Sequence, residues 1–483
     1  MFSPGIEIFG PDTCGDFEPH FHDIDLCQIQ YVVSAPGEPY EQDGYGCAAV
    51  TLNRELGDDP TGAFRPVFRW LDSGTPDEGG PPMLVTLRDA EDPDNTFEYR
   101  APACAAIYDP GYQIIDKTPF EDGIELVVCY QYRDLSSLDP IWQIGVTAVQ
   151  WRDSDVNDFY YKEPTERIDY ELPIWDNDRG EFNPDIAYNC HNGDCYCVYS
   201  ELQEDQNCCY IKYRRYDRAT NKILPGEWRL QNTDHNGHDP SVDVGLVQVG
   251  TELWHAVAVT YTSQFHQGHL GYHICGIGWQ TSEGDHDRQT NFPIINPNFS
   301  TLAAGLSCVD VSPYCNPTNF ATCTYTQVTG SDGFGATTGV FVVNFFGTMA
   351  DLDDHFPVET GGVNIADGMY SSIAIHDQVT ESAPIWASVS YMGQEPESDI
   401  LHPRATRIRL DDPAHTILWN DYIDIDSIIV GNYNISDIPF ENPGVSSAIN
   451  INADNTYWAA WADRIEMEPP PEVITAAWGD TII

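Results

Sequence analysis

The chain has 483 residues, of which 76 are acidic and only 22 are Lys or Arg, so its formal net charge at pH 7 is −54. This charge argues against a nucleic-acid partner, because phosphates would be repelled, and it favours cations or a basic protein surface. Apolar residues make up 41% of the chain, enough for a packed core, and no run of about 18 apolar residues could span a membrane.

A two-strand pattern recurs along the chain. In each copy a short apolar strand follows a turn, polar turn residues come next, and the second strand places small residues between aromatic ones. The clearest copies are Pro184–Ile186 with Tyr196–Tyr199, Pro240–Val242 with Trp254–Tyr261, Ser300–Leu302 with Phe320–Tyr325, Ser371–Ile373 with Trp386–Tyr391, and Ser446–Ala448 with Trp458–Trp461. No segment keeps a helical period over about twelve residues. Repetition of one four-stranded unit predicts an all-β fold, a single β-propeller.

Two more units precede these copies, one at 102–132 and a more divergent one that begins near Asp23. The sequence therefore predicts seven blades in one domain, or six if the first segment is an insertion. The expected blades are 10–95, 96–180, 181–236, 237–297, 298–366, 367–438 and 439–483. The last unit lacks an outer strand, and we expect residues 5–9 to supply it and so to close the last blade.

Tyr99-Arg100-Ala101-Pro102 lies just before the first strand of a repeat. This motif resembles the arginine motif near the start of the sialidase-like (BNR-type) propellers. In that superfamily the arginine binds a substrate carboxylate, because a guanidinium fork matches two oxygens. The resemblance implies that Arg100 is a binding residue; the alternative is a surface arginine ahead of a strand. The Asp-box turn of the superfamily is absent, since Ser331–Gly335 does not match it, and no catalytic residue is predicted.

Clustered histidines are the candidates for a metal site, because several imidazoles must converge on one ion. The candidates are His20, His22, His266, His269 and His273. Acidic clusters, such as the one at Asp351, Asp353 and Asp354, indicate a solvated acidic surface, and a calcium site is the alternative. We therefore expect no cofactor, with calcium or another cation as the alternative.

Fourteen cysteines predict disulfides, which form in oxidising compartments. The grouped candidates are Cys190, Cys195, Cys197, Cys208, Cys209, Cys308, Cys315 and Cys323, and their connectivity stays open. Residues 1–5 lack the basic start and apolar stretch of a signal peptide. We therefore expect an extracellular or virion protein. It would arrive there either after removal of a leader or by release at lysis.

Two functions fit this sequence. The first is a non-enzymatic structural or recognition subunit of an external assembly, a virion or cell-surface appendage, that contacts other protein subunits. Few Lys residues and many Asp residues are typical of adaptation to high salt. The alternative is a secreted carbohydrate-active enzyme or lectin that binds glycans at the axial face of the propeller. Neither involves nucleic acid or insertion into a membrane, and the first is the prediction.

Overall fold

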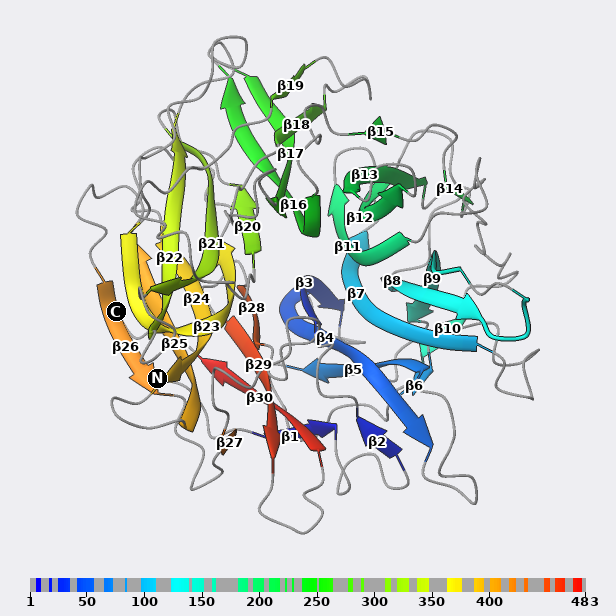
Figure 1. Ribbon diagram of the computed structural model, residues 1–483, viewed down its shortest axis with the longest axis horizontal. Coiled ribbons are helices and arrows are strands. Elements are labelled where there is room, and N and C mark those ends of the chain that lie inside the picture. Colours follow the sequence, from blue (N-terminus) through cyan, green and yellow to red (C-terminus); the bar gives the residue numbers. More distant parts are fainter. Residues whose placement is uncertain are drawn as a thin grey trace.

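The computed structural model describes the strands bounded below and residues 135–138 and 141–142, with side chains for part of them. Every regular element in this part of the chain is a β-strand, which confirms the all-β prediction. No helix that could cross a membrane occurs in it. Figure 1 shows the sheets arranged around a central region.

The first half of the chain forms four sheets, in which all pairs of strands are antiparallel. The first sheet contains β2 (Phe17–Pro19), β3 (Asp25–Ser34), β4 (Glu41–Glu55), β5 (Arg65–Asp72) and β6 (Met83–Leu84). The second contains β7 (Phe97–Asp109), β8 (Gly123–Asp134), β9 (Gln143–Trp151) and β10 (Phe159–Tyr161). The third contains β11 (Glu181–Asn189), β12 (Asp194–Gln203), β13 (Cys208–Asp217), β14 (Lys222–Ile223) and β15 (Trp228–Arg229). The fourth contains β16 (Gly237–Val249), β17 (Glu252–Ser263), β18 (Ile277–Gln280) and β19 (Arg288–Thr290).

The second half forms one larger sheet and a final four-stranded one. The larger sheet contains β20 (Val309–Pro313), β21 (Asn319–Thr329), β22 (Thr337–Phe346), β23 (Val363–Ile375), β24 (Trp386–Gln394), β25 (Ile400–Arg409), β26 (Ile417–Tyr422) and β27 (Val430–Asn432). The final sheet contains β28 (Ser447–Ile451), β29 (Tyr457–Arg464), β30 (Glu472–Gly479) and β1 (Ile6–Phe9).

Two pairings explain how these last sheets are assembled. The first half of β23 pairs with β22 and its second half pairs with β24, so one strand joins two four-stranded units. The N-terminal β1 pairs with β30, next to β29 and β28. In the larger sheet, β21 pairs with β22 on one side and with β20 on the other. The sequence pattern placed the first strand of this unit at 300–302 instead of at β20. Residues 300–302 lie outside the described residues.

The first strand of four units contains a β-bulge. At Arg100/Ala103, Phe182/Asp185, His238/Ser241 and Met369/Ser372, two residues of the first strand face one residue of the second. The single opposing residue is a tyrosine each time: Tyr130, Tyr199, Tyr261 and Tyr391. Three of the bulges contain proline, which a bulge tolerates because no ladder hydrogen bond is needed there. The repeated tyrosine of the sequence pattern therefore marks the bulge.

The bulge residues adopt a backbone conformation that is uncommon for side chains larger than glycine. Ala101 has φ 44° and Asn183 has φ 49°, and each directly precedes a proline. Opposite Tyr130, a close approach requires glycine, because a Cβ at Gly145 would lie 2.5 Å from Cε2 of the tyrosine. The buried Tyr130 hydroxyl meets Thr147 Oγ1 at 3.0 Å.

Apolar side chains fill the spaces between neighbouring sheets. Between the β7–β10 and β11–β15 sheets, small residues such as Ala103 and Ala105 meet Ile186, Cys197 and Tyr199. Between the β11–β15 and β16–β19 sheets, the core contains Tyr196, Val198, Ile211, Tyr213, Val242 and Val259. Alternate residues of β12 thus face opposite neighbours, as the two-residue period of a strand requires.

Aspartates in two first strands tie one sheet to the next. Asp25 Oδ1 accepts a hydrogen bond from Leu26 N at 2.8 Å, and its Oδ2 accepts one from Cys104 N of β7 at 2.7 Å. Asp185 repeats this arrangement with Ile186 N at 2.8 Å and Val242 N of β16 at 2.7 Å. We call these two interactions the carboxylate ties. In both ties, a single carboxylate accepts one hydrogen bond from a backbone N–H of its own sheet and one from a backbone N–H of the next sheet.

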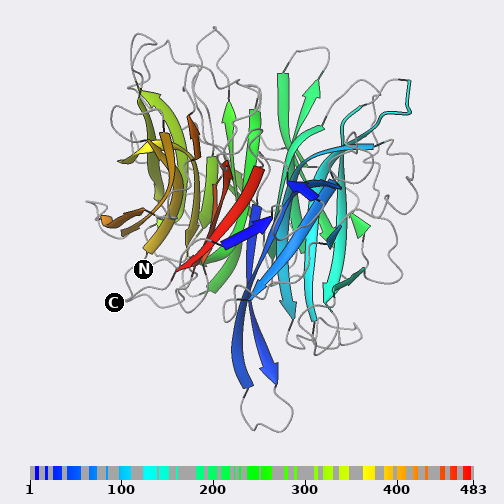
Figure 2. The same cartoon turned by 90° about the horizontal axis from the view of Figure 1, so that it is seen from below.

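One hairpin extends beyond the rest of the sheets. Figure 2 shows β3 and β4 projecting from the body of the molecule, on the side where β3 ends and β4 begins. The opposite ends of these strands lie beside β7, so the hairpin is anchored in the interior.

We predict that Asp185→Ala lowers the free energy of unfolding by about 3 kcal/mol, because two hydrogen bonds to a charged acceptor are lost and part-buried N–H donors remain. Urea denaturation in buffered salt measures this change. Asp134→Ala is the matched control, since Asp134 Oδ1 also accepts two hydrogen bonds, from Ser136 N and Oγ, but at an exposed turn. Equal losses in the two variants would contradict the role of the tie.

Candidate functional site

The β7–β10 sheet carries charged and aromatic side chains at the end where β7 begins and β8 ends. Glu98 and Arg100 precede the bulge of β7, and Arg133 lies opposite Glu98 in β8. Trp142 comes directly before β9. Because opposing residues of antiparallel strands share a face, three neighbouring strands bring these side chains together. We call these four residues the arginine cluster.

A single carboxylate positions both arginines of the cluster. Glu98 Oε1 accepts hydrogen bonds from Arg100 Nε at 3.2 Å and Nη2 at 2.8 Å. Glu98 Oε2 accepts one from Arg133 Nε at 2.6 Å and also contacts Arg133 Nη2. The guanidinium carbons of Arg100 and Arg133 lie 4.8 Å and 4.4 Å from the centroid of the Trp142 ring, within the range of cation–π attraction.

The cluster is open to solvent and locally positive. The side chains of Arg100, Arg133 and Glu98 are 52%, 30% and 28% exposed. Two guanidinium groups and one carboxylate leave a net charge of +1, whereas the chain as a whole carries −54. Glu98 is the acceptor of both arginines within the described residues, and it engages Nε and Nη2 of each. The Nη1 groups can therefore donate to a ligand.

Such an arrangement can bind an anionic group. Guanidinium donors in a fixed orientation match the two oxygens of a carboxylate or the oxygens of a sulfate. The half-buried indole of Trp142 offers an apolar surface beside them. The arrangement supplies recognition, and it contains no nucleophile with an adjacent base.

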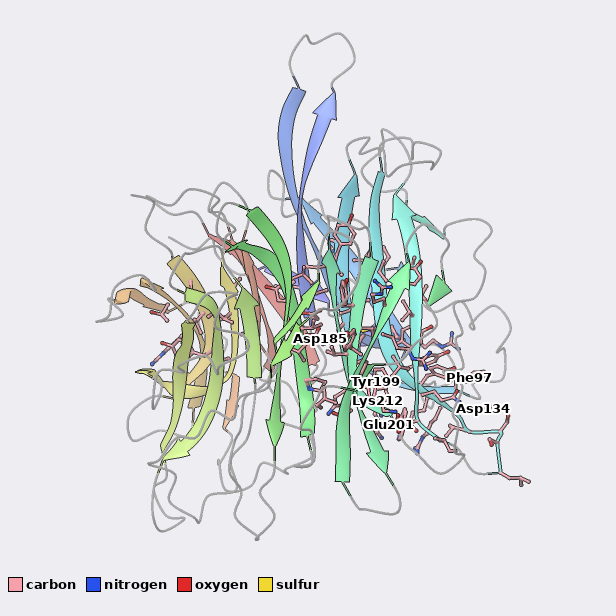
Figure 3. All side chains as sticks on the ribbon, turned by 90° about the horizontal axis from the view of Figure 1, so that it is seen from above. Phe97, Asp134, Asp185, Tyr199, Glu201 and Lys212 are labelled. Atoms are coloured by element: carbon pink, nitrogen blue, oxygen red, sulfur yellow. The ribbon has the colours of Figure 1, made fainter. Side chains whose placement is uncertain are left out.

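A second charged group lies in the interior of the neighbouring sheet. Glu201 in β12 and Lys212 in β13 form an ion pair with side chains only 6% and 11% exposed. Figure 3 shows Glu201 and Lys212 together, below Tyr199. Arg214, two residues along β13, is also buried. The chain has only four lysines, so placing one of them in the interior is a specific feature of this sheet.

Of the predicted binding and metal residues, the structure describes Arg100. It lies in β7 before the bulge, where it contacts Glu98 and Trp142. The histidine candidates, His20, His22, His266, His269 and His273, all lie outside the described residues. Within the described part of the chain, no group of three or more His, Cys, Asp or Glu residues could hold a metal ion.

The cysteine candidates divide into two groups. Cys195 and Cys197 are buried in β12 as free cysteines in the structure, and disulfides at these two positions stay a prediction. The remaining candidates, Cys190, Cys208, Cys209, Cys308, Cys315 and Cys323, lie outside the residues whose side chains are described. Disulfides at those positions stay a prediction.

Sequence reasoning missed three members of the arginine cluster. Arg133 and Trp142 are far from Arg100 in sequence and meet it only through strand pairing. Glu98 was available as a signal, since Glu98 and Arg100 alternate on one strand and a carboxylate there can contact the guanidinium. Trp142 gave no signal, because tryptophans recur throughout the chain.

The chain is weakly similar to sialidase-like propellers. A structure of NanB with Optactamide is 9% identical with a TM-score of 0.41, over 99% of this chain and 70% of that one. A mutant Trypanosoma rangeli sialidase is 8% identical with a TM-score of 0.41, over 99% of this chain and 59% of that one. A Penicillium chrysogenum α-L-arabinanase is 8% identical with a TM-score of 0.39, over 99% of this chain and 98% of that one.

No protein-family model and no curated protein sequence matches the chain.

We predict that Lys212→Met and Glu201→Gln each lower the free energy of unfolding by about 3 kcal/mol, because each alters one partner of a buried ion pair. The double variant should lose less than the sum of the two, since the two changes remove one shared interaction. Denaturant unfolding of all four proteins forms the double-mutant cycle. Additive losses would show that the two charges do not interact.

Proposed function

We propose that the protein is a carbohydrate-binding propeller, a lectin or a carbohydrate-active enzyme, whose ligand carries a carboxylate. The observation that carries this proposal is the arginine cluster, in which Glu98 and Trp142 hold the exposed guanidinium group of Arg100 and the half-buried one of Arg133. The resemblance of residues 99–102 to the arginine motif of sialidase-like propellers also supports it, since that motif's arginine binds a carboxylate and Arg100 belongs to the cluster.

The electrostatics of the chain favour a small ligand over a large anionic polymer. A surface with a net charge of −54 repels polyanions. In physiological salt, however, repulsion by charges more than about 8 Å from the binding site is largely screened. A single acidic sugar can therefore reach the locally positive cluster. Its ring offers C–H groups to the indole of Trp142 and a carboxylate to Arg100 and Arg133.

The proposal includes the architecture that presents the site. The first strands β3, β7, β11, β16, β20, β23 and β28 each contact the next, and β28 contacts β3. We infer from these contacts a closed ring of seven blades, with β1 as the outer strand of the last one. The blade boundaries expected from the sequence are part of this proposal. The arginine cluster lies at the end where the first strands begin, which we take as the binding face.

A second candidate is the structural or recognition subunit that the sequence first suggested. Two exposed leucines favour it, because Leu135 is 49% and Leu138 107% exposed in the turn between β8 and β9. Both lie close in sequence to Arg133 and Trp142, and arginine, tryptophan and aliphatic side chains are typical of protein interfaces. A protein partner could therefore use the same face. Adaptation to high salt and an extracellular or virion location remain part of both proposals.

A glycan array probed in low and high salt tests the first candidate. We expect binding to saccharides with a uronic or nonulosonic acid and none to their neutral counterparts. Arg133→Ala and Arg100→Ala should each weaken binding at least about tenfold, because each removes a charge-assisted hydrogen bond of about 1.5–3 kcal/mol. Arg100→Lys should also bind weakly, since an ammonium lacks the planar fork.

Arg69→Ala is the matched control, because Arg69 is a half-buried arginine in β5 of another sheet. It should bind as the unchanged protein does. Equal binding of acidic and neutral saccharides, or unchanged affinity in both cluster variants, would contradict the proposal. Loss of self-association or of partner binding in Leu138→Ser, with glycan binding absent throughout, would favour the second candidate.

A further inference from the structure

Two buried cysteines meet between the second and third sheets. Cys129 in β8 is fully buried and Cys197 in β12 is 4% exposed. Both belong to the apolar core between the β7–β10 and β11–β15 sheets, where Cys197 lies close enough to Cys129 to raise the pKa of its thiol. They come from different sheets and lie far apart in sequence, so their contact joins units that share no backbone ladder.

This contact occurs where a carboxylate tie is absent. The ties connect the first sheet to the second through Asp25 and the third to the fourth through Asp185. The equivalent position in the second sheet is Ala103, because each of these residues begins the regular ladder of its first strand. Alanine has no acceptor, so no such tie can run from this position to the third sheet.

The residue opposite this position changes at the same time. Asp25 faces Val50 and Asp185 faces Val198, whereas Ala103 faces Cys129. An Asp–Val pair is thus replaced by an Ala–Cys pair in the one sheet of the three that lacks the tie. The small alanine leaves room for the sulfur, and the sulfur meets Cys197 of the next sheet.

We infer that Cys129 and Cys197 form a disulfide in the mature protein, and that this bond is the covalent counterpart of the carboxylate ties. The oxidant is a small-molecule or protein disulfide. The Cys129 thiolate attacks it and releases one thiol, which gives a mixed disulfide on Cys129. The Cys197 thiolate then attacks the Cys129 sulfur and releases the second thiol. The two cysteines lose two protons and two electrons, and the oxidant is reduced to two thiols.

The environment of the pair sets when the bond can form. Burial, together with the hydrogen bond to Cys197 and the charges of Cys197, Asp185 and Asp25, raises the pKa of the Cys129 thiol well above its ordinary value of 9.0. The thiolate is therefore scarce in the folded protein, and exchange is slow there. We therefore expect the disulfide to form faster before the second and third sheets pack than after, and to resist reductants in the folded state.

Peptide mapping under non-reducing conditions tests the inference on the full chain. Protein refolded with reduced and oxidised glutathione is quenched in acid, alkylated in denaturant and digested. We expect a cross-linked peptide pair that contains Cys129 and Cys197, which separates after reduction. Reductant should leave the bond intact in the folded protein and cleave it in denaturant. Its cleavage should lower the thermal midpoint by about 4 °C, since a long loop is released.

Cys195→Ala is the matched control, because Cys195 lies two residues from Cys197 in β12 and belongs to the same core. It should keep the cross-link and the sensitivity of the thermal midpoint to reduction, whereas Cys129→Ala should lose both. Alkylation of Cys129 and Cys197 as separate thiols after oxidative refolding, or a cross-link from either one to another cysteine, would overturn the inference. The mapping uses the unchanged chain, so it does not depend on the folding of any variant.

Discussion

The carboxylate ties are the interactions on which the arrangement of the sheets depends. Hydrogen-bonded ladders hold each sheet together, but the early sheets share no ladder with one another and must be held by side chains. Asp25 and Asp185 do this with charged acceptors that reach backbone donors of the next sheet. In a chain with a charge of −54, these carboxylates stabilise the fold, whereas most others add to repulsion at low salt.

The bulges and the ties are parts of one local design. The bulge of β11 lies just before Asp185, which carries a tie, and the bulge of β7 lies just before Ala103, which replaces one; the opposing tyrosine fills the space that the extra residue creates. The sequence predicted the strands because short first strands such as Pro184-Asp185-Ile186 recur along the chain. Each is followed by a second strand that contains aromatic residues. The sequence could not predict the ties, since a carboxylate in an acidic chain gives no sign of its partner. The positive φ of Ala101 was likewise unmarked, because alanine rarely adopts such a conformation.

In the arginine cluster, too, the sequence revealed what depends on neighbouring residues and not what depends on distant ones. Arg100 could be singled out because its neighbours in sequence resemble a known motif. Arg133 and Trp142 could not, because only the pairing of β7 with β8 and the position of β9 bring them to Glu98. The pairing of Cys129 with Cys197 needed the structure for the same reason. These residues meet because neighbouring strands and sheets bring them together in the folded protein. Their spacing in the sequence carries no information about these contacts.

Amide hydrogen exchange of Asp185→Ala tests the role of the ties most directly. The amides of Val242 and Cys104 are equivalent, and each donates to the aspartate of the preceding tie. The account predicts that Val242 exchanges faster in this variant while Cys104, which is held by Asp25, keeps its rate. An unchanged rate at Val242 would contradict the account, because the carboxylate would then not hold the two sheets together.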